Sequence, residues 1–247
     1  MVRYSRALHD RGWVANHDGN LSARLDSVRV LCTPTAVSKG DVCAEWLIVV
    51  DGNGELLQGT RKPFSELALH LAAYRARPEV GCVIHAHPPT ATGFSVAGVE
   101  LGHPFMAEPV VSLGRNIPTV AYDPSPKADT VQQGLAVALA EADAVLLERH
   151  GVLTVGESLE QAFLRMELVE HLARIALVAH QLGGVRALPG QDIEALAARG
   201  RPASVATGLE PHEGSPVKPT DGGGATGKAG SRPDLDALVN AAVRRHR

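Results

Sequence analysis

Four side chains of this sequence could together bind a divalent metal: those of Glu66, His85, His87 and His150. His85 and His87 directly follow residues 80–84, a short, apolar and β-branched run that is typical of a buried strand. Side chains two positions apart on a strand point the same way, so the two imidazole rings are expected to share one face. A third imidazole and a carboxylate could complete the site and still leave a coordination position open, as in catalytic zinc sites.

Each of these residues also has a common structural explanation when it is taken alone. Histidine pairs occur as ordinary hydrogen-bonded residues, and Glu66 could simply complement the dipole at the start of a helix. His150, which precedes Gly151, could be a hydrogen-bonded turn residue. The metal hypothesis therefore requires that the fold bring all four side chains together.

The elements around these residues alternate between predicted strands and helices. Strands are predicted at residues 28–32, 46–50, 80–84, 109–113, 119–121, 144–147 and 152–155. Helices are predicted at residues 2–13, 63–77, 90–96, 129–141 and 158–182. The helices would cover a central, largely antiparallel sheet, so the sequence predicts a three-layer α/β/α domain.

Local signals indicate where the carboxylate and a bound anion would lie. Pro63 suits the first turn of a helix, where its missing N–H costs nothing. Glu66 would then also lie in that first turn, where the helix dipole favours a carboxylate. Residues 18–22 and 33–40 are predicted to be polar turns whose hydroxyls and free backbone N–H groups are suited to binding an anion.

Composition and charge restrict the classes of protein to consider. The 247-residue chain is 45% hydrophobic, which is enough to bury a core, and its net charge of −3 offers no field for nucleic acid or an anionic membrane. No apolar run is long enough to cross a bilayer, and residues 1–16 lack the apolar stretch of a signal peptide. Cys32, Cys43 and Cys82 fit no C-x-x-C pattern and are expected to be free thiols in a reducing compartment. These features predict a cytoplasmic protein that acts on a small molecule.

The sequence changes character near residue 200. Residues 201–232 are rich in Gly, Pro, Ser and Thr, and they cannot bury enough apolar surface to offset their ordering entropy. We therefore expect a catalytic domain at residues 1–190 and a Gly/Pro-rich, largely disordered tail at residues 191–247. Apolar residues at helical spacing predict a short helix at residues 233–247.

Five short motifs occur in the order and approximate spacing of the class II aldolase/adducin family. They are Gly19-Asn20-Leu21-Ser22, Thr33-Pro34-Thr35, Pro63-Phe64-Ser65-Glu66, His85-Ala86-His87-Pro88 and Arg149-His150-Gly151. The chain therefore resembles this family over approximately residues 3 to 185, and it is most similar to the branch of L-fuculose-1-phosphate aldolase.

The resemblance implies a metal site and an assembly. His85, His87 and His150 would bind Zn²⁺, or another divalent transition metal such as Mn²⁺, Co²⁺ or Fe²⁺. Glu66 would be the catalytic acid/base and an additional metal ligand when substrate is absent. The resemblance also implies a homotetramer with active sites at subunit interfaces.

The resemblance further implies a substrate and a reaction. Gly19, Asn20, Thr35, Ala36 and Ser65 correspond to the residues that bind the substrate phosphate in this family. The expected substrate is a ketose phosphate such as L-fuculose 1-phosphate, cleaved to dihydroxyacetone phosphate and an aldehyde. The metal would stabilise the enediolate formed as the carbon–carbon bond breaks, and a carboxylate would move the proton.

Three positions differ from the family pattern and leave other reactions open. Phe64 and Ala36 stand where the family commonly has serine and glycine, and Ala107 stands where a tyrosine donates a proton in fuculose-phosphate aldolase. A metal-dependent decarboxylase of a hydroxyaromatic or β-keto acid would pass through a similar anion, and Phe64 would suit an aromatic substrate. A sugar-phosphate epimerase or dehydratase is a further alternative. A non-catalytic role like that of adducin is disfavoured, because this chain retains the three histidines and the glutamate.

Overall fold

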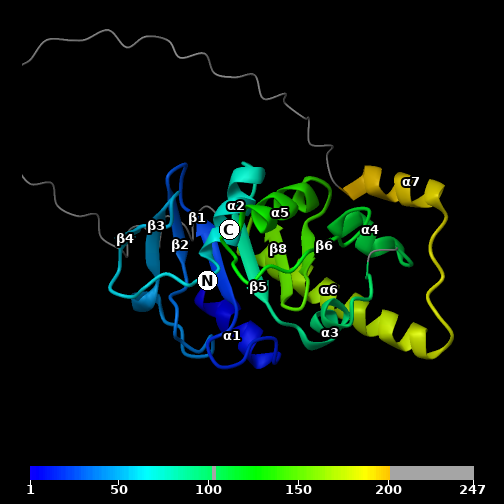
Figure 1. The fold of residues 1–247 in the computed structure, drawn as a ribbon, viewed down its shortest axis with the longest axis horizontal. Coiled ribbons are helices and arrows are strands. Elements are labelled where there is room, and N and C mark those ends of the chain that lie inside the picture. The colour runs from blue at the N-terminus through cyan, green and yellow to red at the C-terminus, as the bar shows by residue number, and fades with distance from the viewer. Residues whose placement is uncertain (102–103, 201–247) are drawn as a thin grey trace, which may run out of the picture.

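The computed structural model describes residues 1–101 and 104–200 (Figure 1). In these residues, eight strands form one sheet in the order β4-β3-β2-β1-β5-β8-β7-β6. The strands are β1 (Asn20–Arg24), β2 (Arg29–Cys32), β3 (Ile48–Asp51), β4 (Leu56–Gln58), β5 (Cys82–Ala86), β6 (Thr119–Val120), β7 (Ala144–Leu147) and β8 (Gly151–Gly156). Neighbouring strands are antiparallel except for β6 and β7, which confirms the predicted, largely antiparallel sheet.

Helices cover both faces of this sheet. They are α1 (Val2–Asp10), the short 3-10 helix η1 (Ala44–Trp46), α2 (Leu67–Ala76), α3 (Pro89–Ala97), α4 (Ala107–Leu113), α5 (Asp129–Glu141), α6 (Leu159–Gln181) and α7 (Gly190–Gly200). Ile84 faces a core cluster shared with α1, α3 and α6, whereas its neighbour Val83 faces a cluster shared with α2 and α5. The alternation along β5 therefore separates two apolar layers, and the predicted three-layer architecture is confirmed.

The position of β5 in the middle of the sheet is what places the histidine pair. β5 pairs with β1 on one side and with β8 on the other, so that His85 lies opposite both Asn20 and Leu153. Val83 and His85 share the face that α2 covers, because residues two apart on a strand point the same way. The start of α2, and with it Glu66, therefore lies over the histidines.

Three predicted elements were wrong in type or in position. Residues 109–113 belong to α4 and not to a strand, because a short apolar run does not distinguish the two and Pro109 sits in the tolerated first turn. The helix predicted from Pro63 begins only at Leu67, so Glu66 immediately precedes it. The predicted polar turn at residues 18–22 overlaps β1, a central strand whose first four residues are buried.

Helix α7 lies within the segment that the sequence analysis assigned to the tail. It contacts α4, the Arg115 guanidinium pairs with the Glu194 carboxylate at 2.8 Å, and Leu188 N donates to the Pro104 carbonyl just before the helix. The folded chain thus continues to Gly200, and the boundary predicted at residue 190 was too early. Residues 201–247, with the predicted linker and terminal helix, lie outside the described residues.

Removing residues 201–247 is expected to leave the melting temperature and the metal content unchanged, because their composition predicts no packed core. A longer deletion that starts after Pro189 also removes α7 and its contacts with α4, and it is expected to lower the melting temperature by several degrees. Differential scanning calorimetry and elemental analysis check both truncations. A change of oligomeric state on the shorter truncation would contradict the prediction.

Cys32, Cys43 and Cys82 are all free thiols, as predicted. Among the helices of the described residues, none combines the length and the apolar character that a membrane span requires.

Candidate metal centre

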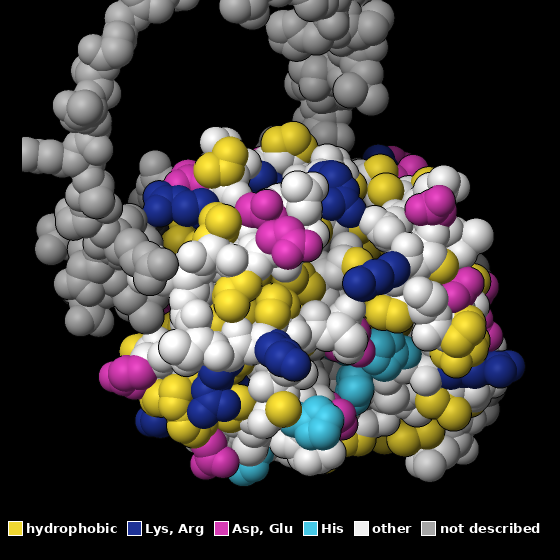
Figure 2. Space-filling model, turned by 60° about the vertical axis from the view of Figure 1, so that its left-hand side comes forward, with side chains coloured by type: hydrophobic (Ala, Val, Ile, Leu, Met, Phe, Trp, Pro, Cys, Tyr) yellow, Lys and Arg dark blue, Asp and Glu magenta, His cyan; other side chains and the backbone are white. Residues whose placement is uncertain are grey.

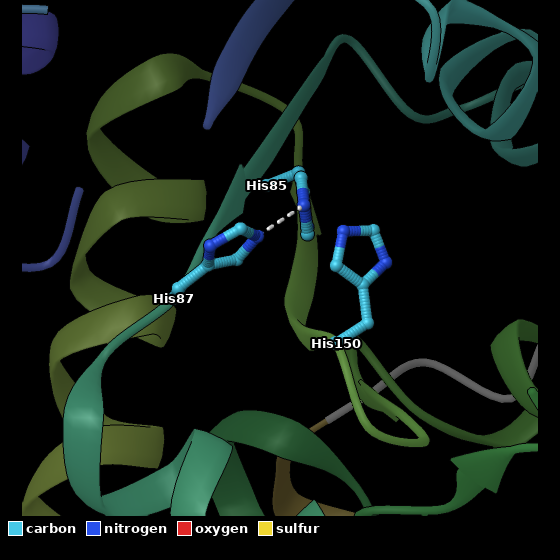
Figure 3. Close-up of side chains that lie close together, drawn as sticks. All are labelled: His85, His87 and His150. Atoms are coloured by element: carbon cyan, nitrogen blue, oxygen red, sulfur yellow. Dashed lines mark hydrogen bonds between the residues drawn. The ribbon is translucent and has the colours of Figure 1, made fainter. Parts of the chain in front are cut away.

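The three predicted histidine ligands lie together at one end of the central strands. Figure 3 shows His85 and His87 on the β5 segment facing the ring of His150, which precedes β8. One ring nitrogen from each histidine can be chosen so that all three lie within 4.8 Å of one another. The Nε2 atoms of His85 and His87 are 3.1 Å apart, close to the separation of about 3.3 Å that two ligands have in a tetrahedral zinc site. The group fits a divalent cation.

His85 is held as a neutral imidazole. Its ring is completely buried, and Nδ1 donates to the Val152 carbonyl oxygen at 2.9 Å. Burial lowers the pKa of His85 to about 3, so the ring carries one proton at neutral pH. Because that proton is on Nδ1, the lone pair of Nε2 points toward His87 and His150, as metal-binding histidines require.

His87 is positioned by its backbone and by a glycine. Its backbone N–H donates to the Trp13 carbonyl at 2.9 Å, and burial together with nearby His150 lowers the pKa of its ring. A Cβ atom at Gly151 would lie 2.5 Å from His87 Cδ2 and 2.6 Å from the Ala86 carbonyl oxygen. Only glycine at position 151 therefore leaves room for His87 in this orientation.

Glu66 lies against the histidine group. Its Oε1 is 2.9 Å from His150 Nε2, and its Oε2 is 3.6 Å from His85 Nε2. Burial opposes ionisation of this carboxyl, but the hydrogen bonds that it accepts from His150 and Asn20 outweigh burial and lower the pKa of Glu66. The carboxylate is thus ionised and placed either to complete the ligand set or to exchange a proton with a bound substrate.

The residues predicted to bind phosphate are distributed over neighbouring segments. Gly19 adopts a left-handed conformation (φ 67°) immediately before β1, where a Cβ atom would lie 3.0 Å from the His85 carbonyl. Thr35 N donates to the Lys62 carbonyl at 3.0 Å, which connects the 33–40 turn to the segment containing Ser65. Ser65 is exposed and available to a ligand. Asn20 differs, because both ends of its side-chain amide already have partners.

Ala36 and Lys39 show how the 33–40 turn is built. Ala36 has φ 57°, the left-handed region that favours glycine, which is the residue that the family pattern has there. The Lys39 side chain is buried, and its Nζ donates to the His17 and Val37 carbonyls. Burial lowers the pKa of Lys39 to about 8. This lysine was not among the predicted binding residues, although a lysine inside a polar, Gly-containing turn was a usable signal.

Phe64 does not contact the space next to the histidines. The residue is 7% exposed, and its ring packs edge-on against His70 at a centroid distance of 5.0 Å. The ring thus packs into the core beside His70, which does not favour the alternative in which Phe64 faces an aromatic substrate. The sequence could not show this, because a phenyl ring between polar residues fits either a ligand or the core.

A cavity of about 390 Å³ opens beside Glu66 and His150. Polar groups on its wall come from Ser65, Tyr122, Arg149 and the carboxylates of Asp123 and Glu148, and apolar residues of β6, β7, α2, α5 and the 121–126 segment line the rest. Arg149 has φ 57°, a strained conformation for a residue with a side chain, and such strain often occurs at functional sites. On the face shown in Figure 2, histidine side chains gather between apolar and charged ones.

A histidine triad beside an ionised glutamate is the arrangement that the sequence motifs predicted, and residues 1–177 match the family described as the Class II Aldolase and Adducin N-terminal domain. The chain belongs to this family. The matched region of this chain covers more than two thirds of the length of each of three relatives.

The chain is similar to proteins with more than one activity. It is 33% identical over 174 residues to "L-fuculose phosphate aldolase" of Methanococcus vannielii, which covers 70% of this chain and 92% of the relative. It is 34% identical over 182 residues to "3-oxo-tetronate 4-phosphate decarboxylase" of an Escherichia coli strain, which covers 72% of this chain and 84% of the relative. A solved structure of "L-fuculose 1-phosphate aldolase" superposes with a TM-score of 0.74 at 27% identity, covering 81% and 93% of the two chains.

Proposed function

We propose that this protein is a divalent-metal-dependent aldolase that cleaves a ketose phosphate, such as L-fuculose 1-phosphate, to dihydroxyacetone phosphate and an aldehyde. The observation that carries the proposal is the Glu66 carboxyl group at the wall of a cavity, with Oε1 2.9 Å from the Nε2 atom of one histidine of a three-histidine group. An aldolase needs such a pair of functions. One stabilises the negative charge that forms as the carbon–carbon bond breaks, and the other moves a proton.

His85, His87 and His150 would hold Zn²⁺, or another divalent ion such as Mn²⁺, Co²⁺ or Fe²⁺, because imidazole nitrogens favour these ions over Mg²⁺ or Ca²⁺. A bound cation supplies Lewis-acid stabilisation of negative charge on the substrate oxygens. Glu66 faces the same space. As the carbon–carbon bond breaks, its carboxylate would take up the proton of the substrate hydroxyl that becomes the aldehyde oxygen, and it would then give that proton to the carbon from which the aldehyde has left. The condensation direction reverses both transfers.

The substrate phosphate is assigned to Gly19, Asn20, Thr35, Ala36 and Ser65. Backbone N–H groups at the left-handed positions Gly19 and Ala36, together with the Thr35 and Ser65 hydroxyls, are the groups that this site offers to an anion. Among these residues Asn20 differs, because its side-chain amide already donates to Glu66. We therefore assign the Asn20 side chain mainly to holding the Glu66 carboxylate, and the phosphate mainly to the other four residues.

The assembly and location that we propose follow the sequence expectations. We propose a homotetramer in the cytoplasm, with active sites at the subunit interfaces. Three free cysteines are consistent with a reducing compartment. Apolar side chains at Leu164, Leu177, Val178 and Leu182 of the α6 segment are exposed and could be covered by another subunit.

A second candidate is a decarboxylase of a phosphorylated β-keto acid. It is favoured by the 34% identity to a relative named 3-oxo-tetronate 4-phosphate decarboxylase. Loss of CO₂ from a β-keto acid leaves an enolate anion, so the histidine group and Glu66 would serve in the same roles. A hydroxyaromatic acid is less favoured, because the Phe64 ring is buried against His70. An epimerase or a dehydratase of a sugar phosphate could use the same groups.

Two assays on zinc- or manganese-loaded protein distinguish the candidates. With L-fuculose 1-phosphate and related ketose 1-phosphates, we expect dihydroxyacetone phosphate to form, measured by coupling it to NADH oxidation with glycerol-3-phosphate dehydrogenase. With 3-oxo-tetronate 4-phosphate, we expect no release of CO₂ above the rate without enzyme. Release of CO₂ without cleavage of any ketose phosphate would replace the aldolase proposal with the decarboxylase.

A further inference from the structure

A buried series of hydrogen bonds extends from Glu66 into the core. Asn20 Nδ2 donates to Glu66 Oε2 at 2.6 Å, and Asn20 Oδ1 lies 2.7 Å from His70 Nε2. On the other side of this ring, Nδ1 lies 2.7 Å from Ser22 Oγ, which is 2.8 Å from the Tyr74 hydroxyl. We call these five residues, Glu66, Asn20, His70, Ser22 and Tyr74, the Glu66 chain.

Only one arrangement of protons satisfies every contact in the Glu66 chain. The Asn20 amide nitrogen donates to Glu66 Oε2, so the amide oxygen faces His70 and can only accept from its ring. His70 therefore carries its proton on Nε2, and its Nδ1 accepts from the Ser22 hydroxyl. Ser22, having donated its proton, accepts from Tyr74. All the donors thus point toward Glu66.

Local periodicity explains why one helix and one strand can supply the whole series. His70 and Tyr74 are four residues apart on α2, and Glu66, the N-cap residue of this helix, is four residues before His70, so all three lie on one side of the helix. Asn20 and Ser22 are two apart on β1 and point to the same face of the sheet. The side chains of α2 and β1 face one another, so Asn20 contacts Glu66 and His70, and Ser22 contacts His70 and Tyr74.

Burial makes this arrangement rigid. His70 and Ser22 are completely buried, and Asn20 is 3% exposed. Burial lowers the pKa of His70 to about 3, so its ring stays neutral at physiological pH. The Phe64 ring packs edge-on against it. A buried polar group without a partner is costly, so each member of the Glu66 chain is held to the one orientation that satisfies its neighbours.

We infer that His70 is a positioning residue which, acting through the Asn20 amide, holds the Glu66 carboxylate in the orientation from which it exchanges a proton with substrate. The inference rests on the proposed role of Glu66 as acid/base. The Glu66 chain orients the carboxylate and does not conduct protons, because the Asn20 amide neither loses nor gains a proton at neutral pH.

The first test compares two substitutions of His70 that differ in one hydrogen bond. His70→Leu removes both ring nitrogens, and we expect kcat for the ketose phosphate to fall about 10–100-fold, as when a residue that orients a functional ligand is lost. KM and metal content should stay near the wild-type values, because His70 touches neither substrate nor metal ligands. His70→Gln retains an N–H donor for Asn20 and should recover most of the kcat.

Matched variants separate orientation from stability. Thr154 is also completely buried, and its hydroxyl donates to the Ala162 carbonyl, away from the Glu66 chain. Thr154→Val should lower the melting temperature without changing kcat. Tyr74 is the member of the Glu66 chain farthest from Glu66, so Tyr74→Phe should lower kcat less than His70→Leu does. A His70→Leu variant with wild-type kcat overturns the inference. So does a Thr154→Val variant that loses as much kcat as His70→Leu.

A second readout does not depend on turnover. In ¹⁵N NMR of the metal-free protein, His70 should show a protonated Nε2 and an unprotonated Nδ1, and the Asn20 side-chain amide resonances should shift in Glu66→Gln. A proton on Nδ1 of His70 overturns the inference even if the enzyme is an aldolase. A different result would separate the two proposals. If the NMR spectra show the expected His70 tautomer and Asn20 shift but the protein cleaves no ketose phosphate, the Glu66 chain is supported and the proposed function is rejected.

Discussion

Replacing both His85 and His87 with alanine is expected to empty the metal site and abolish turnover. Wild-type protein, purified without chelators, should carry close to one equivalent of zinc, manganese, cobalt or iron per chain, measured by elemental analysis. The double variant removes two of three imidazoles and leaves His150 and Glu66, too few ligands to retain a transition metal. Because His85 is completely buried, the variant also loses core packing, so its melting temperature must be recorded beside its metal content.

The matched control removes two histidines that lie elsewhere. His9 on α1 and His171 on α6 are outside the three-histidine group, and their double replacement with alanine should leave the metal content and kcat unchanged. Full metal occupancy in the His85→Ala/His87→Ala variant, in a protein that still melts cooperatively, would rule out this metal centre.

Glu66→Gln is expected to retain the metal and lose most of the turnover. General acid–base catalysis contributes on the order of 10²–10⁴-fold, and glutamine fills the same space without exchanging a proton. Its side-chain oxygen can still accept the hydrogen bond from Asn20, so the surroundings should change little. Steady-state kinetics on metal-loaded variant should therefore show a kcat lower by that factor with a similar KM.

Glu167 provides the matched control for this substitution. Its carboxylate pairs with Arg11 on the surface and is not part of the cavity beside His150. Glu167→Gln should retain wild-type kcat. A Glu66→Gln enzyme with wild-type kcat would mean that Glu66 only complements the N-terminus of α2, which is the simplest structural explanation of a carboxylate at that position.

The sequence alone determined that the His85 and His87 side chains lie together on a buried strand, because the signals for this are local. The two-residue period of a strand predicts that His85 and His87 project together, and an apolar run before them predicts that the strand is buried. The alternation of helices and strands, which the periodicity of apolar residues also indicates locally, predicted the three-layer architecture. Ser158, predicted to cap the helix after it, accepts a hydrogen bond from Gln161 N at the start of α6.

Only the tertiary structure decided what the polar residues of β1 and the segment before α2 do. Asn20 and Ser22 suggested a polar turn, because a buried strand is normally apolar. They lie in the sheet instead, because His70 of α2, about 50 positions away in the sequence, satisfies their hydrogen bonds. Phe64 could equally have faced a substrate until the packing placed it on His70. Local periodicity specifies which way a side chain points, but the free energy of burying a polar group depends on partners that only the folded chain brings together.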